Sequence, residues 1–138
     1  MGRLLGIDYG TKRIGLAVTD PLRIFASPLN TIRTEEFDSF IDDYLKSEDI
    51  DAFVIGYPVK MNNQPSESVN YINPFIRKLR KSFPGIEVHL IDERFTSQMA
   101  LQTMIDGGVK KEGRQDKGMI DKISASIILQ SFLDKSSV

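Results

Sequence analysis

Two apolar runs, Asp51–Tyr57 and Ile86–Ile91, each follow a stretch of helical periodicity, and this order limits the folds open to the chain. The first stretch has apolar residues at helical spacing from Phe37 to Leu45, and the second from Val69 to Phe83. A strand reached through a crossover of that length pairs in parallel with a strand already present, by a right-handed connection. The sequence therefore predicts a sheet with parallel strands and packed helices.

The beginning of the chain predicts an antiparallel part of the same sheet. Leu4–Asp8 and Arg13–Thr19 are strand-like and are separated by a Tyr9-Gly10 turn, which is typical of a hairpin. Arg23–Ile32 is expected to be a third strand at the edge, because Pro28 fits only an edge or a bulge. The predicted fold is α/β: one domain over residues 1–138, with a mixed five-stranded sheet, an antiparallel meander plus parallel strands, and helices on both faces.

Helix ends are predicted from capping residues and breakers. Thr34 is a plausible N-cap for the first helix, and Pro74 predicts a kink in the second, or a restart capped by Asn73. Thr96 or Ser97 is expected to cap a third helix that ends at Gly107-Gly108. A charged loop, Val109–Gly118, then precedes a last helix from about Met119 to Leu133.

Composition excludes several classes of protein. With 41% hydrophobic and 27% charged residues in 138, the chain is not a disordered one, and no apolar run approaches the roughly 18 residues of a membrane span. Cysteine is absent, so disulfides and thiolate metal sites are excluded, and a cytoplasmic location is expected. Residues 34–51 carry eight acids and one base, a net −7, which leaves +6 for the remainder of a chain of net charge −1. One face could therefore accept a polyanion, or both faces could simply be solvated.

Three acidic residues stand where acids are unexpected. Asp8 lies within an apolar strand, Glu93 just past another, and Asp121 on the last helix near small residues. If they converge at one end of the sheet, three carboxylates without cysteine favour Mg²⁺ or Mn²⁺, and two such ions about 3.5–4 Å apart can hold the oxygens of a phosphodiester. The alternatives are that Asp8 caps a turn, Glu93 pairs with a neighbouring base, and Asp121 is solvated.

Basic and glycine-containing segments could bind phosphate. The segment GIDYGTKRIG contains a tight turn with free backbone donors, although a plain hairpin explains it equally well, and it lacks P-loop spacing. Lys60 lies in the loop 58–66, after a strand, where ligands bind in open α/β sheets, although an ordinary solvated loop explains the segment equally well. The loop 110–117 is expected to lie over the three acids; its bases are Lys110, Lys111, Arg114 and Lys117. The run 77–81 is interpreted as a solvated helix face, and His89 as a packed or edge residue.

Four segments together resemble the YqgF/RuvX family. They are GIDYGTKRIGLAVTD, VIGYPVKMNNQPS, IDERFTSQMA and KGMIDKISASIILQSFL, in order from about residue 3 to residue 133. Members have an RNase H-like fold and are described as Holliday junction resolvases or as nucleases acting on the 5′ end of pre-16S rRNA. In the last segment, Ser124-Ala125-Ser126 stands where the family usually has paired alanines, and little effect is expected because both residue types are small.

The resemblance implies a metal-dependent nuclease. It implies that Asp8, Glu93 and Asp121 are catalytic residues and ligands of Mg²⁺ or Mn²⁺, as two ions, with Arg94 orienting Glu93 or touching phosphate. Lys12, Arg13, Lys60 and the bases of 110–117 would bind nucleic acid. A four-way junction calls for a symmetric homodimer, whereas trimming of pre-rRNA in ribosomal precursor particles needs only a monomer, and the resemblance favours pre-rRNA.

Two other classes of function stay open at this point. One is a nucleic-acid-binding assembly factor that keeps the fold without turnover. The other is an ATP-binding relative, because DYGT is similar to the phosphate loop of actin-like ATPases, although those enzymes need two such domains and 138 residues supply one.

Overall fold

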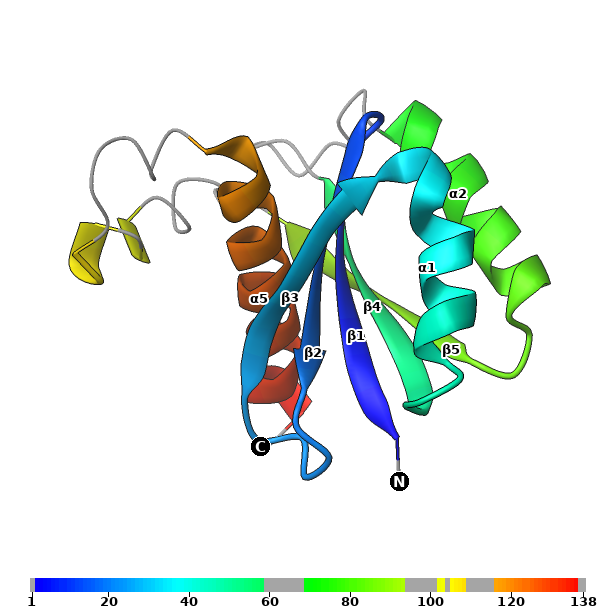
Figure 1. Ribbon diagram of the computed structural model, residues 1–138, viewed down its shortest axis with the longest axis horizontal. Coiled ribbons are helices and arrows are strands. Elements are labelled where there is room, and N and C mark those ends of the chain that lie inside the picture. The colour runs from blue at the N-terminus through cyan, green and yellow to red at the C-terminus, as the bar shows by residue number, and fades with distance from the viewer. Residues whose placement is uncertain (1, 59–68, 94–101, 104, 109–115, 137–138) are drawn as a thin grey trace.

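The chain forms one mixed sheet between two helical layers (Figure 1). The computed structural model describes residues 2–58, 69–93, 102–103, 105–108 and 116–136. Within them the strand order is β3-β2-β1-β4-β5; the strands are β1 (Arg3–Tyr9), β2 (Arg13–Thr19), β3 (Ala26–Arg33), β4 (Ile50–Pro58) and β5 (Glu87–Glu93). β1, β2 and β3 are antiparallel neighbours, and β4 and β5 run parallel to β1. The predicted meander with parallel strands is confirmed.

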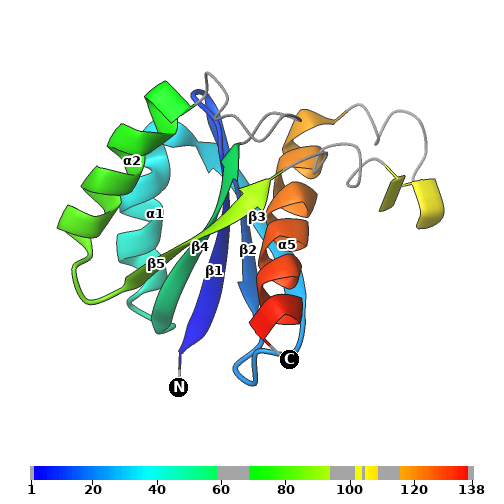
Figure 2. The same ribbon diagram turned by 180° about the vertical axis from the view of Figure 1, so that it is seen from behind.

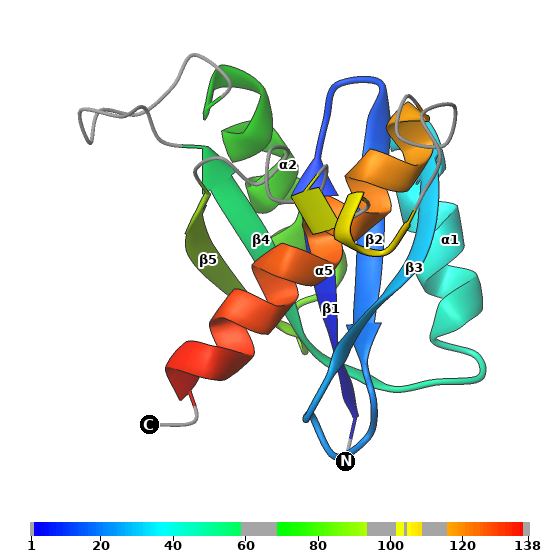
Figure 3. The same cartoon turned by 90° about the vertical axis from the view of Figure 1, so that its left-hand side faces the viewer.

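Helices cover both faces of the sheet, as the sequence predicts. The 3₁₀ turn η1 (Thr34–Glu36), α1 (Phe37–Tyr44) and α2 (Val69–Ser82) lie on one face, and α5 (Lys117–Ser136) lies on the other (Figures 1 and 2). Figure 3 shows α5 running across the strands, with its first turn at the end of the sheet where the β1–β2 turn lies. No helix within the described ranges is long and apolar enough to cross a bilayer.

Strand alternation divides the core into two clusters. Leu5 and Ile7 of β1 pack with α1 and α2, whereas Leu4 of the same strand packs with Leu129 of α5. Both clusters consist of side chains almost completely removed from water. Burial of each large aliphatic side chain contributes about 1.5–3 kcal/mol, so both clusters stabilise the packing of helices on the sheet.

Two glycines allow α5 to lie very close to the sheet. A Cβ atom at Gly15 would lie 2.0 Å from the carbonyl oxygen of Asp121, and one at Gly6 would lie 2.8 Å from that of Ala125. These contacts are with backbone atoms, which cannot turn aside as a flexible side chain can. The glycines of β1 and β2 thus set the height of α5 above the strands.

Ser124 of α5 is a buried hydroxyl with no hydrogen-bond partner among the described residues. We expect Ser124→Ala to raise the free energy of unfolding by about 1 kcal/mol, because an unsatisfied buried polar group is removed. Ser126→Ala is the matched control, since its hydroxyl donates to the carbonyl of Ile123 at 2.6 Å and that bond would be lost. Thermal unfolding of both variants checks this; a lower melting temperature for Ser124→Ala than for Ser126→Ala would contradict it.

Several predicted boundaries are corrected by hydrogen bonds that the sequence does not reveal. Thr34 is not a side-chain cap of α1: its hydroxyl donates to the carbonyl of Gly10 at 2.7 Å. α2 continues through Pro74, so the restart is wrong, and Asn73 instead accepts a hydrogen bond from the Tyr57 hydroxyl at 2.8 Å. β5 continues to Glu93, which therefore ends the strand instead of following it.

β3 begins at Ala26 and not at Arg23, because the preceding residues form a tight loop. Asp20 accepts hydrogen bonds from the backbone N–H groups of Phe25, Ile24 and Leu22. These bonds, led by that of Phe25, hold the pKa of the Asp20 carboxyl below its usual value. β3 is the edge strand, and Pro28 lies beside a register shift, so the prediction for Pro28 is confirmed. Gly108 has a φ of 77°, as expected for the glycine that ends a helix.

Candidate functional site

A hollow of about 230 Å³ lies at the end of the sheet where β1 meets β2. Asp8 enters it from the end of β1, residues 10–12 form the turn, Arg13 begins β2, and Asp121 comes from α5. We call it the Asp8–Asp121 hollow. It brings together two of the three acidic residues that the sequence singled out, across a separation of 113 positions (121 − 8).

The turn that lines the hollow is fixed from the far side by η1. The backbone N–H of Thr34 donates to the carbonyl of Lys12 at 3.1 Å, and the Thr34 hydroxyl donates to the carbonyl of Gly10. Two carbonyls of the turn, those of Gly10 and Lys12, therefore accept hydrogen bonds from one residue. These bonds anchor the turn to η1.

Asp121 is placed by the way α5 begins. Asp116 caps the helix: its carboxylate accepts from the backbone N–H groups of Gly118 at 2.9 Å and Met119 at 3.3 Å. The Thr31 hydroxyl of β3 donates to the carbonyl of Gly118 and ties the first turn to the sheet. Gly15, the register partner of Asp8, then lies directly beneath the backbone of Asp121. These contacts bring Asp121 to the same face as Asp8.

Arg13 and Asp121 form an ion pair inside the hollow. The guanidinium Nε donates to Asp121 Oδ2 at 2.6 Å, and both side chains are only partly exposed, 41% and 21%. Lys12 is exposed and is the other cation that lines the hollow. The hollow thus combines two carboxylates with two cations, an arrangement that can hold a metal ion and an anionic phosphate together.

Glu93 is brought to the same end of the sheet by strand register. β5 runs parallel to β4 and pairs Glu93 with Pro58, so both strands end there together with β1. The side chain of Glu93 lies outside the described part of the structure. Among the side chains that are described, no three carboxylates or histidines gather as a metal site.

The remaining predicted residues fall into two groups. Lys117 is the exposed first residue of α5 and not part of a loop. His89 is packed, as expected: its ring lies 5.0 Å from that of Phe132, and its Nε2 lies 3.1 Å from Glu87. The other predicted nucleic-acid contacts lie outside the described residues; they are Lys60, Arg94, Lys110, Lys111 and Arg114.

Sequence reasoning missed the contact of Thr34 with the β1–β2 turn, the cap formed by Asp116 and the ion-pair role of Arg13. An aspartate directly before a helix is a recognisable cap, so Asp116 could have been found from the sequence. Thr34 and the Arg13–Asp121 pair join distant parts of the chain, and no local pattern indicates them.

Comparison with known proteins places the chain in a family. The family model described as "RuvX: Holliday junction resolvase" matches residues 2–135. The chain belongs to the RuvX family. The four segments that resemble this family in the sequence are therefore correctly interpreted, and the RuvX match spans nearly the whole chain.

Curated relatives of the RuvX chain are similar over their full length. A protein of Flavobacterium johnsoniae is 52% identical over 133 residues, covering 96% of both chains, and one of Phocaeicola vulgatus is 51% identical over 134 residues, covering 97% of this chain and 96% of its own. Both carry the name "Putative pre-16S rRNA nuclease".

Solved structures of junction resolvases share the fold. RuvC of T. thermophilus in complex with a Holliday junction substrate matches with a TM-score of 0.58 at 16% identity, covering 99% of this chain and 96% of that one. The Fowlpox virus resolvase, in a complex with Holliday junction DNA, matches at 0.59 and 13% identity, covering 97% and 98%. The RNase H-like architecture is thereby confirmed.

Proposed function

We propose that the protein is a divalent-metal-dependent endonuclease that cleaves structured RNA at the 5′ end of pre-16S rRNA, with Asp8, Glu93 and Asp121 as its catalytic residues. The observation that carries the proposal is the Asp8–Asp121 hollow, where carboxylates from β1 and α5 meet at the end of the sheet at which β5 delivers Glu93. The names of the relatives, at about half identity over nearly the whole chain, support rRNA as the substrate.

The donor set suits a hard divalent cation. Asp8 and Asp121 offer carboxylate oxygens in an open hollow, and Glu93 would add a third carboxylate. Oxygen ligands of this kind favour Mg²⁺ or Mn²⁺ over softer metals. Bound there, such ions would supply Lewis acidity and neutralise the charge that develops on a phosphodiester. Titration with Mn²⁺ measures whether one or two ions bind to each protein molecule.

The protein's own groups position the phosphate and its ligands. Arg13 holds the Asp121 carboxylate in place and leaves the rest of its guanidinium to meet a phosphate oxygen. Lys12 is exposed at the hollow, and Lys117 is exposed at the start of α5. Both add positive charge that attracts the RNA backbone. Binding should therefore weaken as salt concentration rises.

Cleavage of two substrates by the purified protein tests the proposal. A pre-16S fragment with an unprocessed 5′ leader, free or within ribosomal precursor particles, is compared with a four-way DNA junction, in Mg²⁺ or Mn²⁺ and in EDTA. We expect metal-dependent cleavage of the leader and an intact junction. Sequencing of 16S rRNA 5′ ends in cells depleted of the protein should then show unprocessed leaders.

The family description favours junction resolution as the second candidate function. Symmetric cleavage of the junction by a homodimer, with the leader left intact, would establish that function instead. Tight RNA binding in EDTA without cleavage of either substrate in any metal would show an assembly factor that keeps only the fold.

A further inference from the structure

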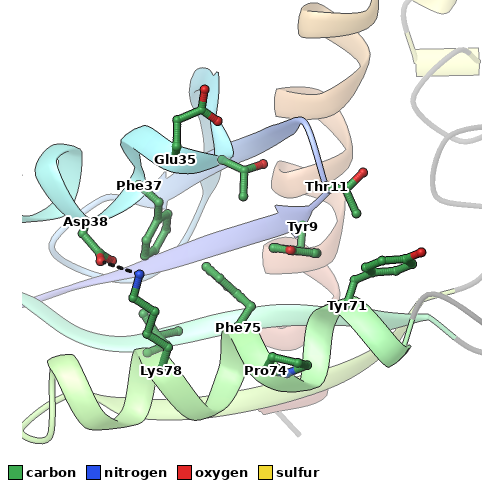
Figure 4. Close-up of a pocket in the computed structure, with 11 residues that line it drawn as sticks. Tyr9, Thr11, Glu35, Phe37, Asp38, Tyr71, Pro74, Phe75 and Lys78 are labelled. Carbon is green, nitrogen blue, oxygen red and sulfur yellow. Dashed lines mark ion pairs between the residues drawn. The ribbon is translucent and has the colours of Figure 1, made fainter.

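A second depression, the α1–α2 groove, adjoins the Asp8–Asp121 hollow on the other face of the sheet. It measures about 430 Å³ and shares Tyr9 and Thr11 with the hollow. Figure 4 shows Tyr71 and Thr11 at one end of the groove, the ion pair of Asp38 and Lys78 at the other, and the rings of Tyr9 and Phe75 between them. Its volume falls within the range of about 300–1,000 Å³ that small-molecule sites occupy.

Aromatic side chains give the groove its chemistry. Tyr9 and Phe75 pack against each other with ring centroids 4.6 Å apart, so these two rings form a fixed wall. Tyr71 projects from the first turn of α2 and is 59% exposed, a large aromatic side chain that the fold itself does not bury. An exposed tyrosine beside a groove is the kind of surface on which a nucleobase stacks.

The charges of the groove favour a base over a phosphate. Glu35 and Asp38 line it, and both belong to the strongly acidic segment 34–51. Lys78 also lines the groove, but it pairs with Asp38 at 3.3 Å, so the three charges leave a net negative lining. The two carboxylates repel a phosphate but accept hydrogen bonds from the N–H groups that base edges carry. The cations of the neighbouring hollow, Lys12 and Arg13, have the opposite preference.

We propose that the α1–α2 groove receives an unpaired nucleobase of the RNA, stacked on Tyr71, while an adjoining phosphate of the same strand lies in the Asp8–Asp121 hollow. This inference rests on the proposed function, since it assumes that RNA is the substrate. Asp8 and Tyr9 point to opposite faces of β1, so a strand that passes over the β1–β2 turn at Thr11 reaches both depressions. The protein then selects RNA that is unpaired beside the cleaved bond.

Fluorescence of a single-stranded RNA probe tests the stacking directly. The probe carries one 2-aminopurine, and binding is measured in EDTA, so that the result does not depend on cleavage. Stacking on Tyr71 should quench the 2-aminopurine. Tyr71→Ala should abolish the quenching and weaken binding by roughly 5- to 100-fold, whereas Tyr71→Phe, which keeps the ring, should retain both. Phe25→Ala is the matched control, because Phe25 is an exposed aromatic, 68%, in the β2–β3 loop at the opposite end of the sheet.

A double-mutant cycle with abasic RNA makes the test decisive. Removing the base that stacks should weaken binding to the unmodified protein by the same factor as Tyr71→Ala, and the two changes together should cost no more than either alone. Additive losses, or unchanged binding and quenching in Tyr71→Ala, would overturn the inference. If Tyr71→Ala folds poorly, the abasic probe on the unmodified protein still measures what the base contributes, and Tyr71→Phe, which keeps the ring, shows whether position 71 tolerates a change. Metal-dependent cleavage that persists in such a case would leave the proposed function standing.

Discussion

Asp8→Asn is expected to reduce cleavage of the pre-16S leader by more than about 100-fold. The substitution removes from the hollow a charged oxygen that would bind the metal in the proposed function, while it keeps the size of the side chain. Replacing even an outer-shell partner of a metal ligand costs about 10- to 100-fold in affinity or activity, so loss of the ligand itself should cost more. Initial rates at saturating Mn²⁺ measure the effect.

Two controls accompany Asp8→Asn. Asp43→Asn removes an equally negative residue from an exposed position on α1, where the side chain is 77% exposed, and should leave the rate unchanged. Mn²⁺ should raise the melting temperature of the unmodified protein and of Asp43→Asn, but not that of Asp8→Asn, because a ligand stabilises only the state that binds it. Cleavage that survives in Asp8→Asn would refute the catalytic assignment of all three acids.

Gly15→Ala is expected to damage both stability and cleavage. Its new methyl group would lie 2.0 Å from the backbone carbonyl oxygen of Asp121, so α5 must move away from β2. Overpacking of this kind costs about 1–3 kcal/mol, and here it also separates Asp121 from Asp8. Chemical denaturation measures the first effect, and cleavage by the folded fraction measures the second.

Other glycines provide a graded comparison for Gly15→Ala. Gly85→Ala meets no atom within 4 Å and should be neutral or gain about 0.4–1 kcal/mol. Gly6→Ala should also destabilise, since its methyl group would lie 2.8 Å from Ala125, but farther along α5 from Asp121. At an equal folded fraction, Gly15→Ala should therefore lose more cleavage than Gly6→Ala. Equal activity in the two variants would show that the approach of α5 at Gly15 is not what positions Asp121.

The order of elements could be predicted from the sequence because local patterns determine it. Alternating and helical spacings indicate strands and helices, and the length of the crossovers determines which strands are parallel. The three acids could be singled out because a carboxylate in an apolar strand such as Leu4–Asp8 is costly without a partner. Helix and strand ends were less predictable, as Thr34 shows, because a contact with the distant Gly10 decides its role.

The Asp8–Asp121 hollow could be predicted only as a possible convergence. Its two carboxylates come together because Gly15 has no side chain to hold α5 away from the strands. In the sequence alone, nothing distinguishes this glycine from an ordinary small residue of a strand. The Arg13–Asp121 pair and the α1–α2 groove likewise depend on how distant elements pack. Geometry of this kind follows from the fold as a whole and has no local signature.

The distance along the chain between Asp8 and Asp121 has a consequence for biosynthesis. A ribosome has to add more than a hundred residues after Asp8 before Asp121 exists, and α5 must then leave the exit tunnel before it can dock on β1 and β2. A nascent chain consequently has no complete Asp8–Asp121 hollow until α5 has been made and has docked. An activity directed at ribosomal RNA would thus arise only after α5 has left the exit tunnel of the ribosome that made it.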